Sequence, residues 1–287
     1  MTTVLFVRHG LTALTGPVLA GWTPGVVLDD RGRAQARALA ARLAQVPLHA
    51  IVTSPLERCR QTAEAIAAAS TLDGSPPIHP PPIHEDERVG ECRYGDWTGK
   101  QIKKLAREPL WRVVQAHPSA ARFPGPDGES ILDMQHRAIA AVRDWNARLG
   151  QDATYAICSH GDVIKSLIAD SLGMHIDQFQ RIQVDPCSLT VIRYTPLRPF
   201  LVRMNDTGGG AEGLVRLPKA SQGTGHGASD AVVGGGAGAV SGAGAGTEGG
   251  HDRNGSQAVP VRDSAGRDMD GAVGPGGGRR RAADTRG

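Results

Sequence analysis

The sequence predicts an α/β fold, a three-layer sandwich with helices on both faces of a mainly parallel sheet. Three short runs at residues 4–7, 49–53 and 154–158 are rich in apolar residues, as buried strands of parallel sheets are. A helical pattern follows each strand after a connection or loop. Strand–helix alternation of this kind places helices on both faces of a parallel sheet.

Composition divides the chain into two parts. Every Phe, Trp and Tyr lies at or before Phe200, whereas residues 206–287 lack aromatic residues and hold most of the 38 glycines. Such a segment buries too little apolar surface to offset the entropy lost on ordering. We therefore expect a folded domain over residues 1–205 and a glycine-rich disordered tail over residues 206–287.

Charge and cysteine usage exclude several classes of protein. The net charge is only +3 with acids and bases interspersed, which does not suggest a nucleic-acid partner. No apolar run reaches membrane-spanning length and no signal-peptide pattern opens the chain, so we expect a cytoplasmic protein with no membrane partner. The four cysteines lack C-x-x-C spacing, which predicts free thiols and no metal site: Cys59, Cys92, Cys158 and Cys187.

The elements of the first half follow from capping residues and prolines. Asp29 or Asp30 can cap a helix that begins near Arg31. Ser54 can cap the next helix, residues 57–69, with a proline at its first position. Residues 73–90 contain five prolines and are expected to form an extended loop.

Periodicity predicts the elements of the second half. These are short helices at 100–107 and 109–116, a long amphipathic helix at 131–149, a helix at 163–172, and strands at 187–194 and 200–204. We expect residues 73–130 to form an insertion over the carboxyl ends of the strands. Trp97 is expected to pack within that insertion.

Polar residues stand where three of the predicted strands end. Arg8 and His9 follow the first strand, Arg58 follows the second and His160 follows the third. The carboxyl ends of parallel strands meet at one edge of a sheet, so these side chains should lie together. Arginine forks and helix N-termini suit phosphate oxygens. The sequence therefore predicts an anion site that fits a phosphoryl group.

These residues belong to a longer series of motifs, and the chain resembles the histidine phosphatase superfamily, in the branch of cofactor-dependent phosphoglycerate mutase and its phosphatase relatives. Six blocks occur in that family's order: residues 8–12, 28–36, 54–63, 91–99, 128–130 and 159–161. The sequence around Trp22, Trp111 and His117 also resembles an actinobacterial subgroup. Members of that subgroup are called phosphomutases, and their substrate is not settled.

The resemblance implies a catalytic set of His9, Glu91 and His160. His9 would attack phosphorus as a neutral imidazole and form a phosphohistidine. Glu91 would protonate the leaving oxygen and then activate the incoming water or alcohol. No metal or other cofactor is needed, because two arginines and the helix ends supply the positive field.

The remaining implied residues bind the phosphoryl group and the rest of the substrate. The phosphate-binding set is Arg8, Arg58, His160, Gly161 and Thr15, and the substrate-binding set is Arg93 and Thr12. Thr15 stands where relatives often have Asn. Asp162 follows Gly161, where we expect it to cap a helix rather than to act as an acid.

Three functions remain open at this point. The favoured one is a phosphatase that acts on a small phosphorylated metabolite. A phosphomutase shares every residue that touches the phosphoryl group and differs in excluding water. A non-catalytic phosphate-binding regulator is the third, although such a protein should have lost His9 or Glu91. The sequence leaves the oligomeric state open.

Overall fold

The computed structural model describes residues 1–70, 80–209, 233, 234 and 236. Its centre is one sheet in the order β3-β2-β4-β1-β5-β6. Neighbours among β1 to β4 run parallel, and β5 and β6 add two antiparallel strands at one side. The strands are β1 (Thr2–Arg8), β2 (Ile51–Thr53), β3 (Ile83–Glu85), β4 (Thr154–Ser159), β5 (Leu189–Tyr194) and β6 (Pro199–Asp206). The predicted α/β class is confirmed.

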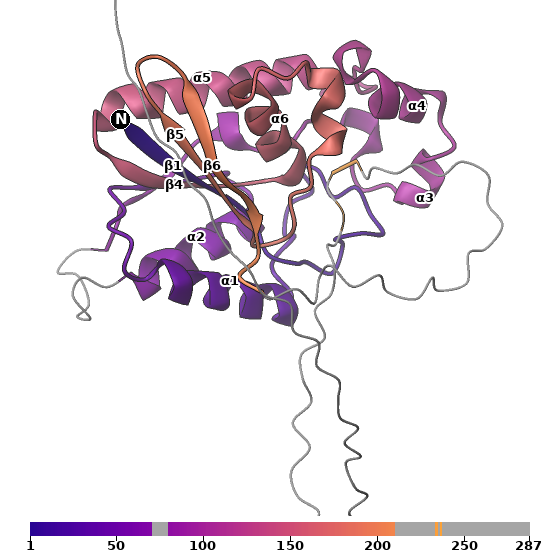
Figure 1. The fold of residues 1–287 in the computed structure, drawn as a ribbon. Coiled ribbons are helices and arrows are strands. Elements are labelled where there is room, and N and C mark those ends of the chain that lie inside the picture. The colour runs from indigo at the N-terminus through magenta and orange to yellow at the C-terminus, as the bar shows by residue number, and fades with distance from the viewer. Residues whose placement is uncertain (71–79, 210–232, 235, 237–287) are drawn as a thin grey trace, which may run out of the picture. The chain divides into compact units, whose positions relative to one another are not determined.

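Helices cover both faces of the sheet (Figure 1). On one face, α1 (Asp30–Leu43) and α2 (Glu57–Ala69) pack against Leu5 and Val7 of β1. On the other, α5 (Ile131–Leu149) and α6 (Gly161–Ser171) pack against Val4 and Phe6. Successive residues of one strand point to opposite faces, so β1 supplies both cores and is buried throughout its apolar run.

The segment between β3 and α5 holds short helices. These are α3 (Ile102–Leu105) and α4 (Pro109–Ala116), with the 3₁₀ turns η1 (Glu87–Val89), η2 (Gly95–Trp97) and η3 (Pro118–Ala120); η4 (Ile176–Arg181) follows α6. Trp97 is buried and stacks on Trp111 with ring centroids 6.2 Å apart, so it packs as predicted.

The expected loop at residues 73–90 is partly wrong. Residues 71–79 lie outside the described part of the chain, but β3 and η1 occupy the rest. All three residues of β3 are exposed, and its register pairs Ile83 with Ile51 of β2. A three-residue exposed strand carries too little pattern to be recognised, because its structure comes from the neighbouring strand.

Two helix starts also differ from expectation. The N-cap of α2 is Leu56, with no side-chain cap, so Ser54 does not cap that helix. The N-cap of α6 is His160, and this helix begins at Gly161, two residues earlier than predicted. As a result, the histidine stands at the junction of β4 and α6.

Candidate active site

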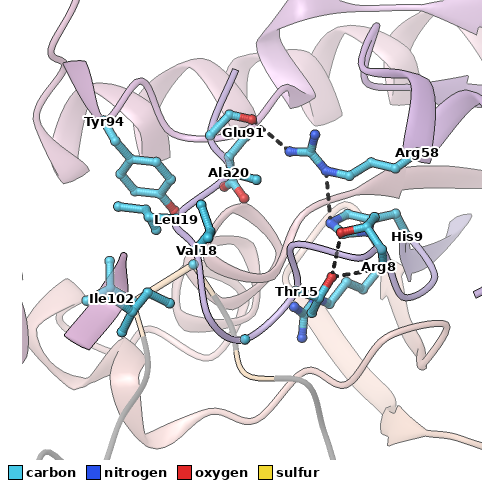
Figure 2. A pocket seen from close by; sticks show the side chains of 15 residues that line it. Arg8, His9, Thr15, Val18, Leu19, Ala20, Arg58, Glu91, Tyr94 and Ile102 are labelled. Carbon is cyan, nitrogen blue, oxygen red and sulfur yellow. Dashed lines mark hydrogen bonds between the residues drawn. The ribbon is translucent and has the colours of Figure 1, made fainter. Parts of the chain in front are cut away.

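A small cavity lies at the carboxyl end of β1 (Figure 2). Its walls come from the β1 end, the following loop, α2 and the insertion: they include Arg8, His9, Leu19, Arg58, Glu91, Tyr94 and Ile102. The insertion therefore lies over this edge of the sheet, as predicted. The cavity measures about 30 Å³, which is room for about two water molecules.

His9 is held in one tautomer. Its backbone N–H donates to the Ser159 carbonyl at 3.0 Å, which continues the pairing of β1 with β4. Nδ1 lies 2.8 Å from the Gly10 carbonyl oxygen, and a carbonyl only accepts, so Nδ1 carries the proton. Burial, with the charges of Arg58 and Arg8, lowers the pKa of His9 well below its ordinary value. The ring is neutral, and its Nε2 carries no proton.

Arg58 connects the two histidines. Its Nε donates to Nε2 of His9 at 3.2 Å, and its Nη2 donates to the Gly21 carbonyl at 2.9 Å and to Nδ1 of His160 at 3.3 Å. Figure 2 shows the guanidinium directed toward His9. The buried Nη1 has no hydrogen-bond partner among the described residues. A buried donor of this kind suits an incoming anionic oxygen.

His160 lies behind this pair. It is fully buried, and its ring centroid is 5.1 Å from that of His9. Because Arg58 donates to Nδ1, the proton belongs on Nε2, which lies 2.8 Å from Ser54 Oγ. Its Nδ1 is 3.6 Å from Glu91 Oε2. Burial, followed by the charge of Arg58, lowers the pKa of His160 well below its ordinary value.

Glu91 is the buried acid of the cavity. Only 4% of its surface is exposed, and its Oε1 accepts from the backbone N–H of Cys92 at 3.0 Å. Burial, and secondly the charge of Asp162, raise the pKa of Glu91 to about 7, against the opposing effect of Arg58 and Arg8. A carboxyl of this kind can give and take a proton near neutral pH.

The model of the histidine phosphatase superfamily (branch 1) matches residues 4–207. The chain belongs to this superfamily. Phosphoserine phosphatase 1 of Hydrogenobacter thermophilus is 27% identical over 188 residues, covering 63% of this chain and 81% of that protein. A probable phosphoglycerate mutase, GpmB of Shigella boydii, is 28% identical over 196 residues, covering 68% of this chain and 86% of that one.

A solved structure agrees with these relatives. YhfR of Bacillus stearothermophilus superimposes with a TM-score of 0.61 at 28% identity, covering 72% of this chain and 98% of that one. The resemblance inferred from the six sequence blocks is confirmed, and this histidine phosphatase is an enzyme whose relatives are phosphatases and phosphomutases.

Of the other residues predicted for the site of this histidine phosphatase, some line the cavity and others do not. Thr12 and Thr15 line the cavity, and their hydroxyl oxygens lie 2.9 Å apart. Among the described residues that line it, neither His160 nor Gly161 appears. Arg93 is also absent from that lining, and its guanidinium lies 4.2 Å from the Trp22 ring centroid.

Three residues of the predicted tail lie in the site. Val233 is fully buried, and both it and Gly234 line the cavity. The Gly234 N–H donates to Asp162 Oδ2 at 2.8 Å, and the Gly236 carbonyl accepts from Nη1 of Arg8 at 2.7 Å. These three residues are thus not solvated as the composition suggested; the rest of the tail after residue 209 lies outside the described residues.

Sequence reasoning missed the polar residues that hold the site from behind. Ser54 carries the hydrogen bond to His160, and Tyr94 donates to Asp162 at 3.1 Å. The signal for Ser54 was its place directly after β2, at the same sheet edge as the other site residues. Within the described ranges, no three His, Cys, Asp or Glu side chains gather to hold a metal ion. Those ranges also contain no helix that could cross a membrane.

Proposed function

We propose that this enzyme hydrolyses a small phosphate monoester through a phosphohistidine at Nε2 of His9. The observation that carries the proposal is the pair of contacts on the imidazole. Gly10 holds Nδ1–H at 2.8 Å, while Arg58 meets Nε2 at 3.2 Å. The nucleophilic lone pair therefore faces a guanidinium that can bind a phosphoryl oxygen.

In the first step, Nε2 of His9 bonds to phosphorus while the ester P–O bond breaks. Glu91 gives its proton to the leaving oxygen, which departs as an alcohol. Arg58 and Arg8 offset the negative charge on the phosphoryl oxygens in the transition state.

In the second step, a water oxygen bonds to phosphorus and the P–N bond breaks. The Glu91 carboxylate takes the proton from that water, which restores the starting protonation of the enzyme. His160, held by Ser54 and Arg58, supports the arrangement from behind. A contact of Thr15 with the phosphoryl group and of Thr12 with the substrate is supported by their position in the cavity wall.

Release of inorganic phosphate from a panel of small phosphate esters tests this function. We expect release by the parent protein and none above background by His9→Asn. The substrate is a small phosphorylated metabolite, by analogy with relatives named for phosphoserine and phosphoglycerate. A cytoplasmic location stays a prediction from the sequence.

A phosphomutase is the second candidate. A relative named as a probable phosphoglycerate mutase, GpmB of Shigella boydii, favours it, and a mutase differs from a phosphatase in how well its site keeps water from the phosphoenzyme. A mutase would convert one phosphate isomer into another and release almost no free phosphate. A non-catalytic regulator is disfavoured, since both His9 and Glu91 are present and buried in the site.

A further inference from the structure

A second buried carboxyl, Asp162, is hydrogen-bonded to two residues that line the cavity with Glu91, and it has no part in the two steps above. Asp162, in the first turn of α6, is 3% exposed. Its Oδ2 accepts from the Tyr94 hydroxyl at 3.1 Å and from the Gly234 N–H at 2.8 Å. Its Oδ1 lies 3.3 Å from the ammonium of Lys165. Every one of these partners donates, so the contacts suit a carboxylate.

Lys165 fixes that carboxylate in place. The lysine is itself 4% exposed, and its ammonium also donates to Gln180 Oε1 at 3.1 Å. It lies 5.7 Å from the centroid of the Phe179 ring on η4. A pair buried and hydrogen-bonded in this way holds its charges in one geometry. Helix capping, which the sequence suggested for Asp162, is not what the side chain does: the contacts run to Tyr94, Gly234 and Lys165.

We propose that Asp162 is a positioning residue whose fixed negative charge keeps Glu91 protonated until the leaving oxygen arrives. This inference rests on the proposed function, since it assigns Glu91 the role of acid. Two buried carboxyls that act on each other electrostatically do not both ionise readily. The three donors around Asp162 favour its carboxylate form, so Glu91 is the carboxyl that retains the proton. The raised pKa of Glu91 agrees, because Asp162 is the largest contribution to it after burial.

Other charged and titratable groups also act on Glu91. They are Arg8 of β1, Arg58 of α2, Arg137 of α5, which donates to the Glu91 carbonyl at 2.9 Å, His160 at the N-cap of α6, and the neighbouring Cys92 and Tyr94. Arg8 and Arg58 oppose Asp162. When the Asp162 charge is removed, the arginines remain, so the pKa of Glu91 should fall and the general acid should be lost at lower pH.

The test is the pH profile of kcat/KM for Asp162→Asn with two esters. An alkyl phosphate has a poor leaving group and needs the acid, whereas p-nitrophenyl phosphate does not. We expect the alkaline limb for the alkyl ester to move to lower pH by about one unit or more, with a loss of about tenfold or more at pH 7.5. The aryl ester should change by less than about threefold.

Two further variants separate the effect of the Asp162 charge from any damage to the fold. Asp162→Glu keeps the charge and should restore the parent's alkaline limb. The double variant Asp162→Asn with Lys165→Met avoids leaving a buried lysine unpaired, so it can be used if the single variant does not fold. The alkaline limb of its kcat/KM profile should also move to lower pH. An unmoved limb in the folded variants, or equal losses with both esters, overturns the proposal. A parent protein that releases no phosphate overturns the proposed function instead.

Discussion

Nε of Arg58 donates to Nε2 of His9 across 3.2 Å, and both side chains are buried. The contact joins the start of α2 to the end of β1. The guanidinium lies where the Nε2 lone pair points, which is also where phosphorus would bond. A bound phosphoryl group would therefore contact the guanidinium directly. Its Nη1, without a partner among the described residues, is the donor ready for a phosphoryl oxygen.

Replacing Arg58 should therefore damage catalysis more than folding. Arg58→Lys keeps the charge but loses the planar fork, and we expect kcat/KM to fall about 100-fold. The matched control is Arg60→Lys on the same helix, whose half-exposed side chain pairs with Glu85. Steady-state kinetics on both variants decide the matter. Similar values for Arg58→Lys and Arg60→Lys would contradict the assigned role.

Replacing Glu91 with Gln should stabilise the protein at high pH and lower its activity. Its pKa is about 7 in the folded chain and ordinarily 4.5, so the folded state holds this proton to a higher pH than the unfolded chain. The folded state therefore loses relative stability as pH rises from 4.5 through 7. Glu91→Gln removes that loss, and we expect it to be more stable than the parent at pH 8 by on the order of 2–3 kcal/mol.

Thermal unfolding at two pH values checks this. The Tm of Glu91→Gln should exceed that of the parent at pH 8 and match it at pH 4.5. The same variant should hydrolyse alkyl phosphates about 100-fold more slowly than the parent. A Tm difference that is the same at both pH values would show that the carboxyl does not titrate as described.

Truncation after Gly209 should open the cavity. It removes Val233 from the cavity wall and the Gly236 carbonyl from Arg8. A substrate then no longer competes with Val233 for space or with the Gly236 carbonyl for the Arg8 guanidinium. We expect KM to fall about tenfold, which corresponds to about 1.4 kcal/mol, with kcat little changed. Truncation after Gly242 retains the three contacting residues and is the matched control. Equal KM values for the two truncated proteins would contradict a role for this segment.

Much of the site could be predicted because its residues adjoin strong local patterns. Arg8, His9 and His160 follow apolar runs, and α2 spans Glu57–Ala69 as its periodicity predicted. Parallel strands then bring these ends to one edge. The sequence thus suffices where a side chain's position follows from the strand that precedes it.

The remaining features depend on contacts between distant segments. Ser54 looks like a helix cap, since a serine before proline and glutamate has the same local pattern whether it caps or faces a histidine. Asp162 depends on Tyr94, 68 positions away. Val233 lies in a segment rich in glycine and alanine, whose average composition does not indicate that one of its residues is buried. None of these follows from periodicity.

The proposed phosphohistidine mechanism is tested most directly by locating the phosphoryl group on the enzyme. The protein is mixed with a reactive phosphate ester, quenched in alkali, digested, and the peptides are examined by mass spectrometry and ³¹P NMR. We expect an acid-labile phosphate on Nε2 of His9 in the parent and in Glu91→Gln, and none in His9→Asn. Phosphate on another residue, or hydrolysis by His9→Asn at the parent's rate, would contradict it.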